Sequence, residues 1–128
     1  MGFFSNFKNK ISLKIAIERL MIDVLEIRRE IHPVFAKELT KSAADWAIAN
    51  GFEKDLEGRR MTTAFMSLCA IIESRFISAD NTMKPVLLNL YEALIDVAHD
   101  KPYGISQEGI MLQVANYFRY QKELNQNN

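Results

Sequence analysis

The fold of this 128-residue chain is decided by residues 3–31, which read FFSNFKNKISLKIAIERLMIDVLEIRREI. Apolar residues recur in this stretch at steps of three and four, and such steps keep one face of a helix apolar over about five turns. They are Leu13, Ile17, Leu20, Val24, Ile27 and Ile31. The spacing is that of the a and d positions through which two helices pack along their length. It predicts a long N-terminal helix that packs in a helical bundle.

The same helix has a second apolar side besides this stripe. Its members are Ile11, Ile15, Ile22 and Leu25. A peripheral helix of a small monomer needs to bury only one face, so two apolar faces indicate a central position or a second partner. We therefore expect the chain to self-associate through its first helix, as a homodimer, or to bind another helical protein.

Proline and glycine residues mark the ends of the other predicted helices. His32-Pro33 is expected to end the first helix, because the residue before a proline is driven out of the helical conformation, and Pro33 then opens the second. The second helix stops at Asn50-Gly51, and a third runs from about Glu53 to Ile77. Gly58 marks either a weak point of this third helix or the start of its regular part.

Two further helices are predicted in the C-terminal third of the chain. Pro85 lies in the first turn of one, and Ser106 caps the other after a loop. Residues 64–72 are apolar nearly all round, which predicts that the third helix is the central one. The expected fold is therefore all-α, a single-domain bundle of four to five helices. It spans residues 1–128, with an amphipathic segment at 1–10 and a frayed tail at 125–128.

The composition fits a globular domain of ordinary solubility. The sequence is 48% hydrophobic and 25% charged, and its formal net charge is zero. Because the chain outside residues 1–14 has no basic excess, we do not expect it to bind nucleic acid. No apolar run reaches the length of a membrane span, and the N-terminus lacks the pattern of a signal peptide. A cytoplasmic location is expected.

The sequence holds few groups with the spacing of an active site. It has no glycine-rich phosphate loop, no nucleophile elbow and a single cysteine, so we expect no cofactor and lean against an enzyme. Glu73 and His32 are the candidate catalytic residues, since Glu73 directly follows the most apolar stretch and histidine titrates near neutral pH. Glu92, Asp96 and His99 share a helix face and are the candidate metal ligands.

The first residues of the chain are the candidate contact with a partner or a membrane. They are Phe3, Phe4, Phe7, Lys8 and Ile11. An aromatic, lysine-flanked amphipathic segment can rest in a membrane interface or dock in a groove of a protein. The sequence therefore favours a non-enzymatic interaction or regulatory module, with two alternatives: a peripheral membrane factor, or a small metal-dependent enzyme.

Overall fold

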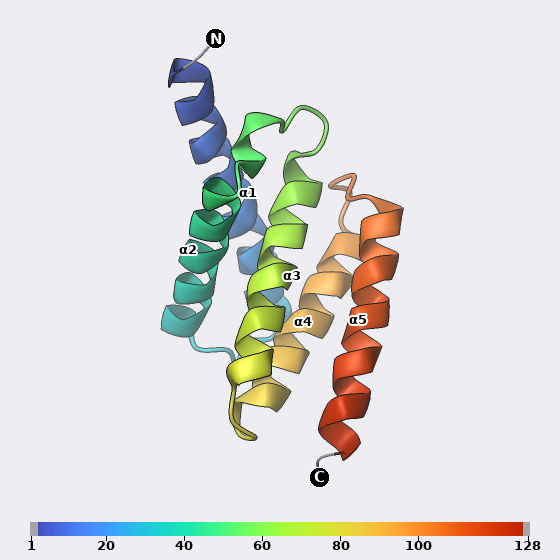
Figure 1. Cartoon of the computed structure of the whole chain (residues 1–128). Helices are drawn as coiled ribbons and strands as arrows, with labels where there is room; N and C mark the ends of the chain where they lie inside the picture. The colour runs from blue at the N-terminus through green and yellow to red at the C-terminus, as the bar shows by residue number, and fades with distance from the viewer. Residues whose placement is uncertain (1–2, 127–128) are drawn as a thin grey trace.

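Residues 3–126 are the part of the chain that the computed structural model describes, with the backbone alone for residues 3–5. They form five α-helices and one short 3-10 helix, with no strand (Figure 1). In chain order these are α1 (Phe3–Ile27), α2 (Pro33–Ala49), η1 (Phe52–Lys54), α3 (Arg60–Ser78), α4 (Met83–Asp100) and α5 (Gln107–Gln126). The predicted all-α helical bundle is confirmed.

The third helix, α3, is the centre of the bundle. It packs against each of the other four α-helices, and it lies between α2 and α5 in Figure 1. The apolar run at residues 64–72 explains this position, since a helix that is apolar nearly all round needs neighbours on most sides. Phe65, Leu68 and Ile72 are fully buried there. Cys69 is also fully buried, and burial raises the pKa of its thiol well above the ordinary value.

The inner face of α1 is part of the same core. Leu13, Ile17, Leu20 and Val24 are each 0% exposed, as the stripe in the sequence predicts. Burying one such aliphatic side chain stabilises the fold by about 1.5–3 kcal/mol, so this face is a large part of what holds α1 to the body.

The end of the first helix differs from the prediction. α1 stops at Ile27, before His32-Pro33, and the chain then turns, with the Ile31 N–H donating to the Arg28 carbonyl at 3.2 Å. Ile31 is buried from this turn and not from the helix, whereas Ile27 is 46% exposed. The prediction that both residues continue the buried helical stripe was wrong. Ile27 is the last residue of α1 and lies on the surface, and Ile31 lies beyond the end of the helix.

The boundaries around α2 and α3 follow local backbone chemistry. His32 caps α2, since its Nδ1 accepts a hydrogen bond from the Val34 N–H at 3.1 Å, and Pro33 begins the helix. Gly51 and Gly58 have φ angles of +75° and +72°, which disfavour residues with a side chain. Gly58 therefore precedes the regular helix α3, which is the second of the two predicted roles.

Candidate functional site

The outer face of α1 carries a row of exposed aliphatic side chains. Ile11, Ile15 and Ile22 are 45%, 56% and 50% exposed, and they lie on the side of the helix away from the buried stripe. Their spacing of four and seven residues keeps them on one face. Three of the four residues of the predicted second apolar side thus form a surface on α1, whereas Leu25 is half-buried against the core.

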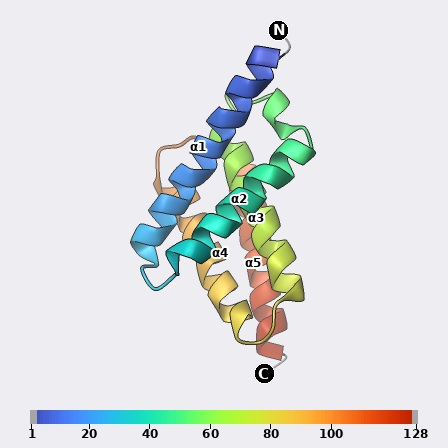
Figure 2. The same cartoon turned by 90° about the vertical axis from the view of Figure 1, so that its left-hand side faces the viewer.

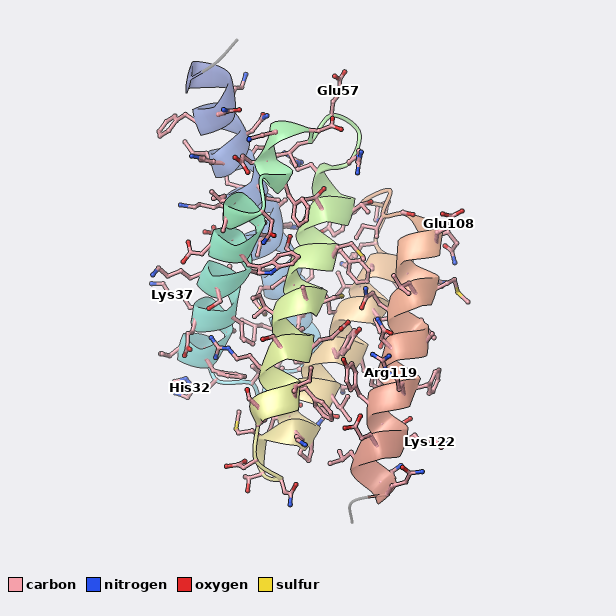
Figure 3. The ribbon with its side chains drawn as sticks, in the orientation of Figure 1. His32, Lys37, Glu57, Glu108, Arg119 and Lys122 are labelled. Carbon is pink, nitrogen blue, oxygen red and sulfur yellow. The ribbon has the colours of Figure 1, made fainter. Side chains whose placement is uncertain are left out.

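A groove between α1 and α2 borders this face. The two helices cross on the same side of the molecule (Figure 2), and the cavity between them has a volume of about 530 Å³. Its apolar walls include Met21 and Leu25 from α1 and Ala36 and Ala44 from α2. Lys37 stands at the rim and points away from the bundle (Figure 3). The outer face of α1 and this groove form one continuous surface with an apolar interior and charged edges.

Charge is distributed unevenly along α1. Its N-terminal half carries Lys8 and Lys14 on the surface, with no acid before Glu18. Its C-terminal half carries the exposed carboxylates of Glu18 and Glu26. The two halves therefore differ in charge: the first has exposed lysines and no acid, and the second has these carboxylates together with one exposed cation, Arg19, which lies 3.9 Å from the buried Asp23.

The N-terminal contact residues predicted from the sequence lie at the start of α1. This end of the helix projects beyond the rest of the bundle (Figure 1). Phe7 is 56% exposed, Ile11 is 45% exposed, and Lys8 is on the surface beside them. The side chains of Phe3 and Phe4 lie outside the described part of the structure.

A polar contact on the flank of α1 was missed from the sequence. Asp23 is only 2% exposed, and its carboxylate accepts a hydrogen bond from the hydroxyl of Tyr103 in the loop before α5. Arg19 Nε donates to the same hydroxyl at 3.0 Å. These bonds tie the loop to α1. An acid inside the apolar stretch of α1 was the available signal, but its partner is eighty residues away.

Glu73 has several hydrogen-bond donors around its carboxylate. Oε1 accepts from the Tyr91 hydroxyl at 2.8 Å and from Asn116 Nδ2 at 3.3 Å, and Oε2 accepts from the Tyr120 hydroxyl at 3.4 Å. Tyr91 also contacts Gln113 of α5. Burial, and then the charges and hydrogen bonds around it, raise the pKa of Tyr91 well above its ordinary value. Glu73 thus links α3 to α4 and α5.

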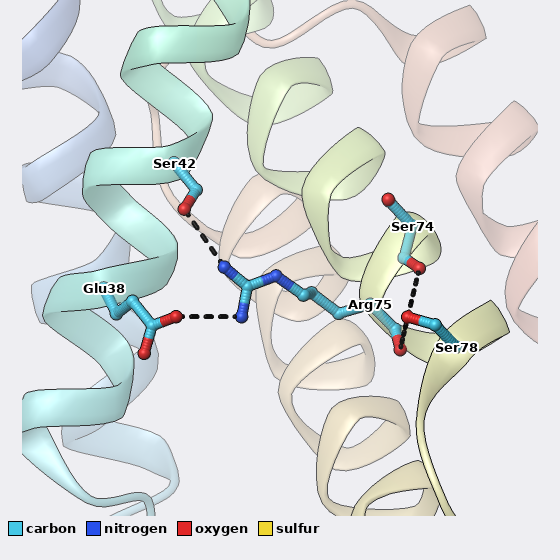
Figure 4. Close-up of polar contacts among 5 residues, drawn as sticks. All are labelled: Glu38, Ser42, Ser74, Arg75 and Ser78. Atoms are coloured by element: carbon cyan, nitrogen blue, oxygen red, sulfur yellow. Dashed lines mark hydrogen bonds and ion pairs between the residues drawn. The ribbon is translucent and has the colours of Figure 1, made fainter.

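Arg75, two residues further along α3, points to the opposite neighbour. Its Nη1 donates to Glu38 Oε1 at 3.0 Å and its Nη2 to Ser42 Oγ at 3.1 Å, both on α2 (Figure 4). Figure 4 also shows Ser78 bonded to the last turn of α3. The charges that follow the apolar run of α3 therefore hold its neighbours on both sides.

The candidate metal ligands on α4 have other partners. Glu92 accepts a hydrogen bond from the Tyr117 hydroxyl at 2.7 Å and lies 3.6 Å from Arg28 Nη2, and His99 Nδ1 lies 2.8 Å from Asp100. Partial desolvation raises the pKa of Asp96, and the charges of Glu92 and Asp100 raise it further. Within residues 3–126, no three histidine, cysteine or acidic side chains are grouped as a metal site.

His32 is exposed and is engaged by its own helix. Its Nδ1 accepts the Val34 N–H, so that nitrogen serves as the cap of α2 and is not available to take a proton from a substrate without losing the cap. Of the two candidate catalytic residues, Glu73 alone is gathered with other polar side chains from facing helices.

Comparisons with known proteins add no family or relative. No protein-family model, no curated protein and no solved structure matches this chain. None of the helices within residues 3–126 combines the length and apolar character that a membrane span requires.

Proposed function

We propose that this protein is a non-enzymatic interaction module that forms a homodimer through the outer face of α1. The observation that carries the proposal is the exposure of Ile11, Ile15 and Ile22 on a helix whose other side is fully buried. Scattered apolar residues on a surface need no explanation, but a stripe along one helix is typical of an interface.

The charges on α1 favour a second copy in the antiparallel orientation as the occupant of this face. In a two-fold symmetric pair, each residue contacts the other copy's matching surface. Antiparallel helices would set the lysines of one N-terminal half, Lys8 and Lys14, near Glu18 and Glu26 of the other copy. The same orientation opposes the two helix dipoles favourably.

The size of the surface indicates that α2 takes part as well. With 25 residues, α1 is roughly 37 Å long. A strip about 10 Å wide along it offers roughly half of the ~800 Å² per partner that a standard interface buries. The groove between α1 and α2, with Met21, Leu25 and Ala36 in its walls, supplies apolar surface directly beside that strip.

Light scattering at micromolar concentration tests the proposal. We expect the mass of a dimer for the wild-type chain and of a monomer for Ile15→Glu and Ile22→Glu, because a carboxylate placed in an apolar contact loses its hydration. Ile77→Glu is the matched control: Ile77 is 69% exposed but lies at the end of α3, so the dimer should persist. A wild-type monomer at all accessible concentrations would rule the homodimer out.

Membrane association is the second candidate, and the projecting start of α1 favours it. Phe7, Lys8 and Ile11 lie there on the surface, and each lysine near anionic lipid contributes roughly 1 kcal/mol. Co-sedimentation with vesicles containing phosphatidylserine should then fall when Phe7→Ser and Lys8→Glu are combined. Ile22→Glu should leave that binding unchanged. Equal binding by the wild type and the combined variant would exclude the anchor.

A further inference from the structure

A cavity of about 450 Å³ lies over α3, and it is separate from the surface of α1. Its walls come from α2 and η1 on one side and from α5 on the other, the two sides that flank α3 in Figure 1. The volume is within the range of sites that hold small organic ligands. None of its lining residues belongs to α1, so its role is independent of dimerisation.

The wall of this cavity has an apolar part and a polar part. Trp46 and Phe52 form a tilted aromatic pair with ring centroids 5.3 Å apart, and Met66 and Ala70 of α3 add further apolar surface. The polar part is formed by Glu73 of α3 with Gln113 and Asn116 of α5. An apolar wall with a few convergent polar groups is typical of a ligand site.

The cavity carries one negative charge without a matching cation. Asp55 and Arg59 both line it, but they neutralise each other, with Arg59 Nη1 3.2 Å from Asp55 Oδ2. Glu73 has no ion pair with any lysine, arginine or histidine within residues 3–126. Its direct partners are the neutral groups of Tyr91, Asn116 and Tyr120. Arg119 reaches this cluster only through the Tyr120 hydroxyl, to which its Nη2 donates at 3.2 Å, and it does not line the cavity. A half-buried carboxylate in this position favours a cation over an anion or a neutral ligand.

The carboxylate of Glu73 also has room for another donor. An ionised carboxylate has about four acceptor positions. Oε1 uses two of them at 2.8 Å and 3.3 Å, whereas Oε2 has one long contact, 3.4 Å from the Tyr120 hydroxyl. Oε2 is therefore the atom of Glu73 with the most unused acceptor capacity.

We propose that this cavity binds a small protonated organic amine with an aromatic body. The ammonium group donates to the carboxylate of Glu73, and the body packs against Trp46, Phe52 and Met66. Trp46 and Phe52 supply large contact area, and their ring faces attract the positive edge of the ligand's aromatic ring. The carboxylate of Glu73 selects the ammonium group, so the two parts of the wall recognise two features of the same molecule.

Trp46 makes the proposal directly measurable. It is the single tryptophan of the chain and lines the cavity, so tryptophan fluorescence reports on this wall. Titration of the full chain with phenethylamine should give a saturable change with a Kd on the order of 1 mM, reasonable for a ligand of this size. The neutral isostere 2-phenylethanol should bind about tenfold more weakly, because it lacks a charge-assisted hydrogen bond.

A second probe identifies the source of the amine. Nα-acetyl-lysine amide presents the ammonium of a protein side chain without an aromatic body. We expect this probe to bind more weakly than phenethylamine, because it leaves the aromatic wall uncovered. Tighter binding would overturn the assignment to a free aromatic amine and point to a lysine of a protein partner.

Two variants and one matched control separate binding from folding. Glu73→Gln should weaken phenethylamine about tenfold and leave 2-phenylethanol unchanged. Glu92→Gln is the control, because Glu92 also accepts a tyrosine hydroxyl, at 2.7 Å, but does not line this cavity. Ala70→Leu fills the cavity without removing a polar group, and should weaken binding of every probe.

The proposal fails under clear conditions. It is overturned if no probe gives a saturable change of Trp46 fluorescence, or if Glu73→Gln and Glu92→Gln weaken phenethylamine equally while both retain the wild-type melting temperature. Should Glu73→Gln fail to fold, the Ala70→Leu variant decides: undiminished binding of phenethylamine would place the ligand elsewhere.

Discussion

On the inner face of α1, Leu13, Ile17 and Leu20 are fully buried, whereas on its outer face Ile11, Ile15 and Ile22 are 45–56% exposed. Both faces consist of large aliphatic residues at helical spacing. The inner face belongs to the core that α1 shares with the other helices, whereas the outer face is exposed and only Ile22 borders the groove with α2. An apolar periodicity therefore predicts a buried face only where the fold provides a neighbouring helix. An apolar helix face without such a neighbour is the first place to look for a partner.

The largest difference between the faces should appear in stability. Leu20→Ala should lower the free energy of unfolding by about 2–5 kcal/mol, since it leaves a cavity in the core, and Ile15→Ala should change it by no more than ~0.5 kcal/mol in dilute solution. Urea denaturation measures both. Faster labelling of Cys69 by a thiol reagent should accompany Leu20→Ala alone, because this thiol is fully buried. Equal losses at the two positions would contradict the comparison.

The flank between the two faces should show an intermediate effect. Tyr103→Phe removes the hydroxyl that donates to the buried carboxylate of Asp23. The loss of this partner should lower the free energy of unfolding by about 1–3 kcal/mol. Thermal denaturation provides the measurement. Tyr117→Phe is a suitable control, since it also removes a tyrosine–carboxylate bond, but to the less buried Glu92. Tyr103→Phe should cost more than Tyr117→Phe, and the reverse order would be evidence against a structural role for Asp23.

A smaller effect, dependent on concentration, should mark the outer face. If α1 pairs across a dimer, the melting temperature of the wild-type chain should rise with protein concentration by mass action. Ile22→Ala should reduce this dependence, with a loss of about 1 kcal/mol in dimer stability. Leu20→Ala should lower the melting temperature by the same amount at every concentration. A wild-type melting temperature that is independent of concentration would argue that the outer face has no partner copy.

The smallest effect should come from the charges that orient the pair. Lys8→Glu and Glu26→Lys should each weaken the dimer severalfold, since exposed ion pairs contribute about 0.2–1 kcal/mol. The double variant should recover most of the loss, because the opposite charges again face each other in an antiparallel pair. Sedimentation equilibrium at low salt measures the dissociation constants. Additive losses in the double variant would exclude the antiparallel orientation.

A titration at high pH tests the hydrogen bond between Tyr117 of α5 and Glu92 of α4. Partial desolvation, and then the hydrogen bond to Glu92, raise the pKa of Tyr117 to about 12. A raised pKa means that the folded state favours the neutral phenol over the phenolate. The contribution of Tyr117 to stability is therefore fully present below the ordinary tyrosine pKa of about 10, and it is lost as the pH rises from there through about 12. Absorbance titration of the phenolate should show Tyr117 ionising late in the wild type, and earlier in Glu92→Gln.

Much of the fold was accessible from the sequence, but the candidate sites were accessible only in part. Residues 64–72 predicted the central helix and Pro33 the start of α2, because these signals act within a few residues. The predicted start of the third helix at about Glu53 was too early, and Gly58 offered the correct start as only one of two alternatives. Ile27 and Ile31 were misassigned, since His32-Pro33 predicted the end of α1 but the sequence did not reveal that the helix stops as early as Ile27. The cavity beside Trp46 and Phe52 had no sequence signal, because its walls come from α2, η1, α3 and α5.

The long first helix and its two apolar faces can be read from the sequence, since periodicity is a local property of the chain. Which of the two faces is buried depends on neighbours that are distant in sequence, so it follows from the packing of the bundle. The same reason applies to Glu73: the sequence placed a charge after an apolar run, and the fold supplied Tyr91, Asn116 and Tyr120 as its partners. Local pattern fixes the helices, and long-range packing fixes what their faces meet.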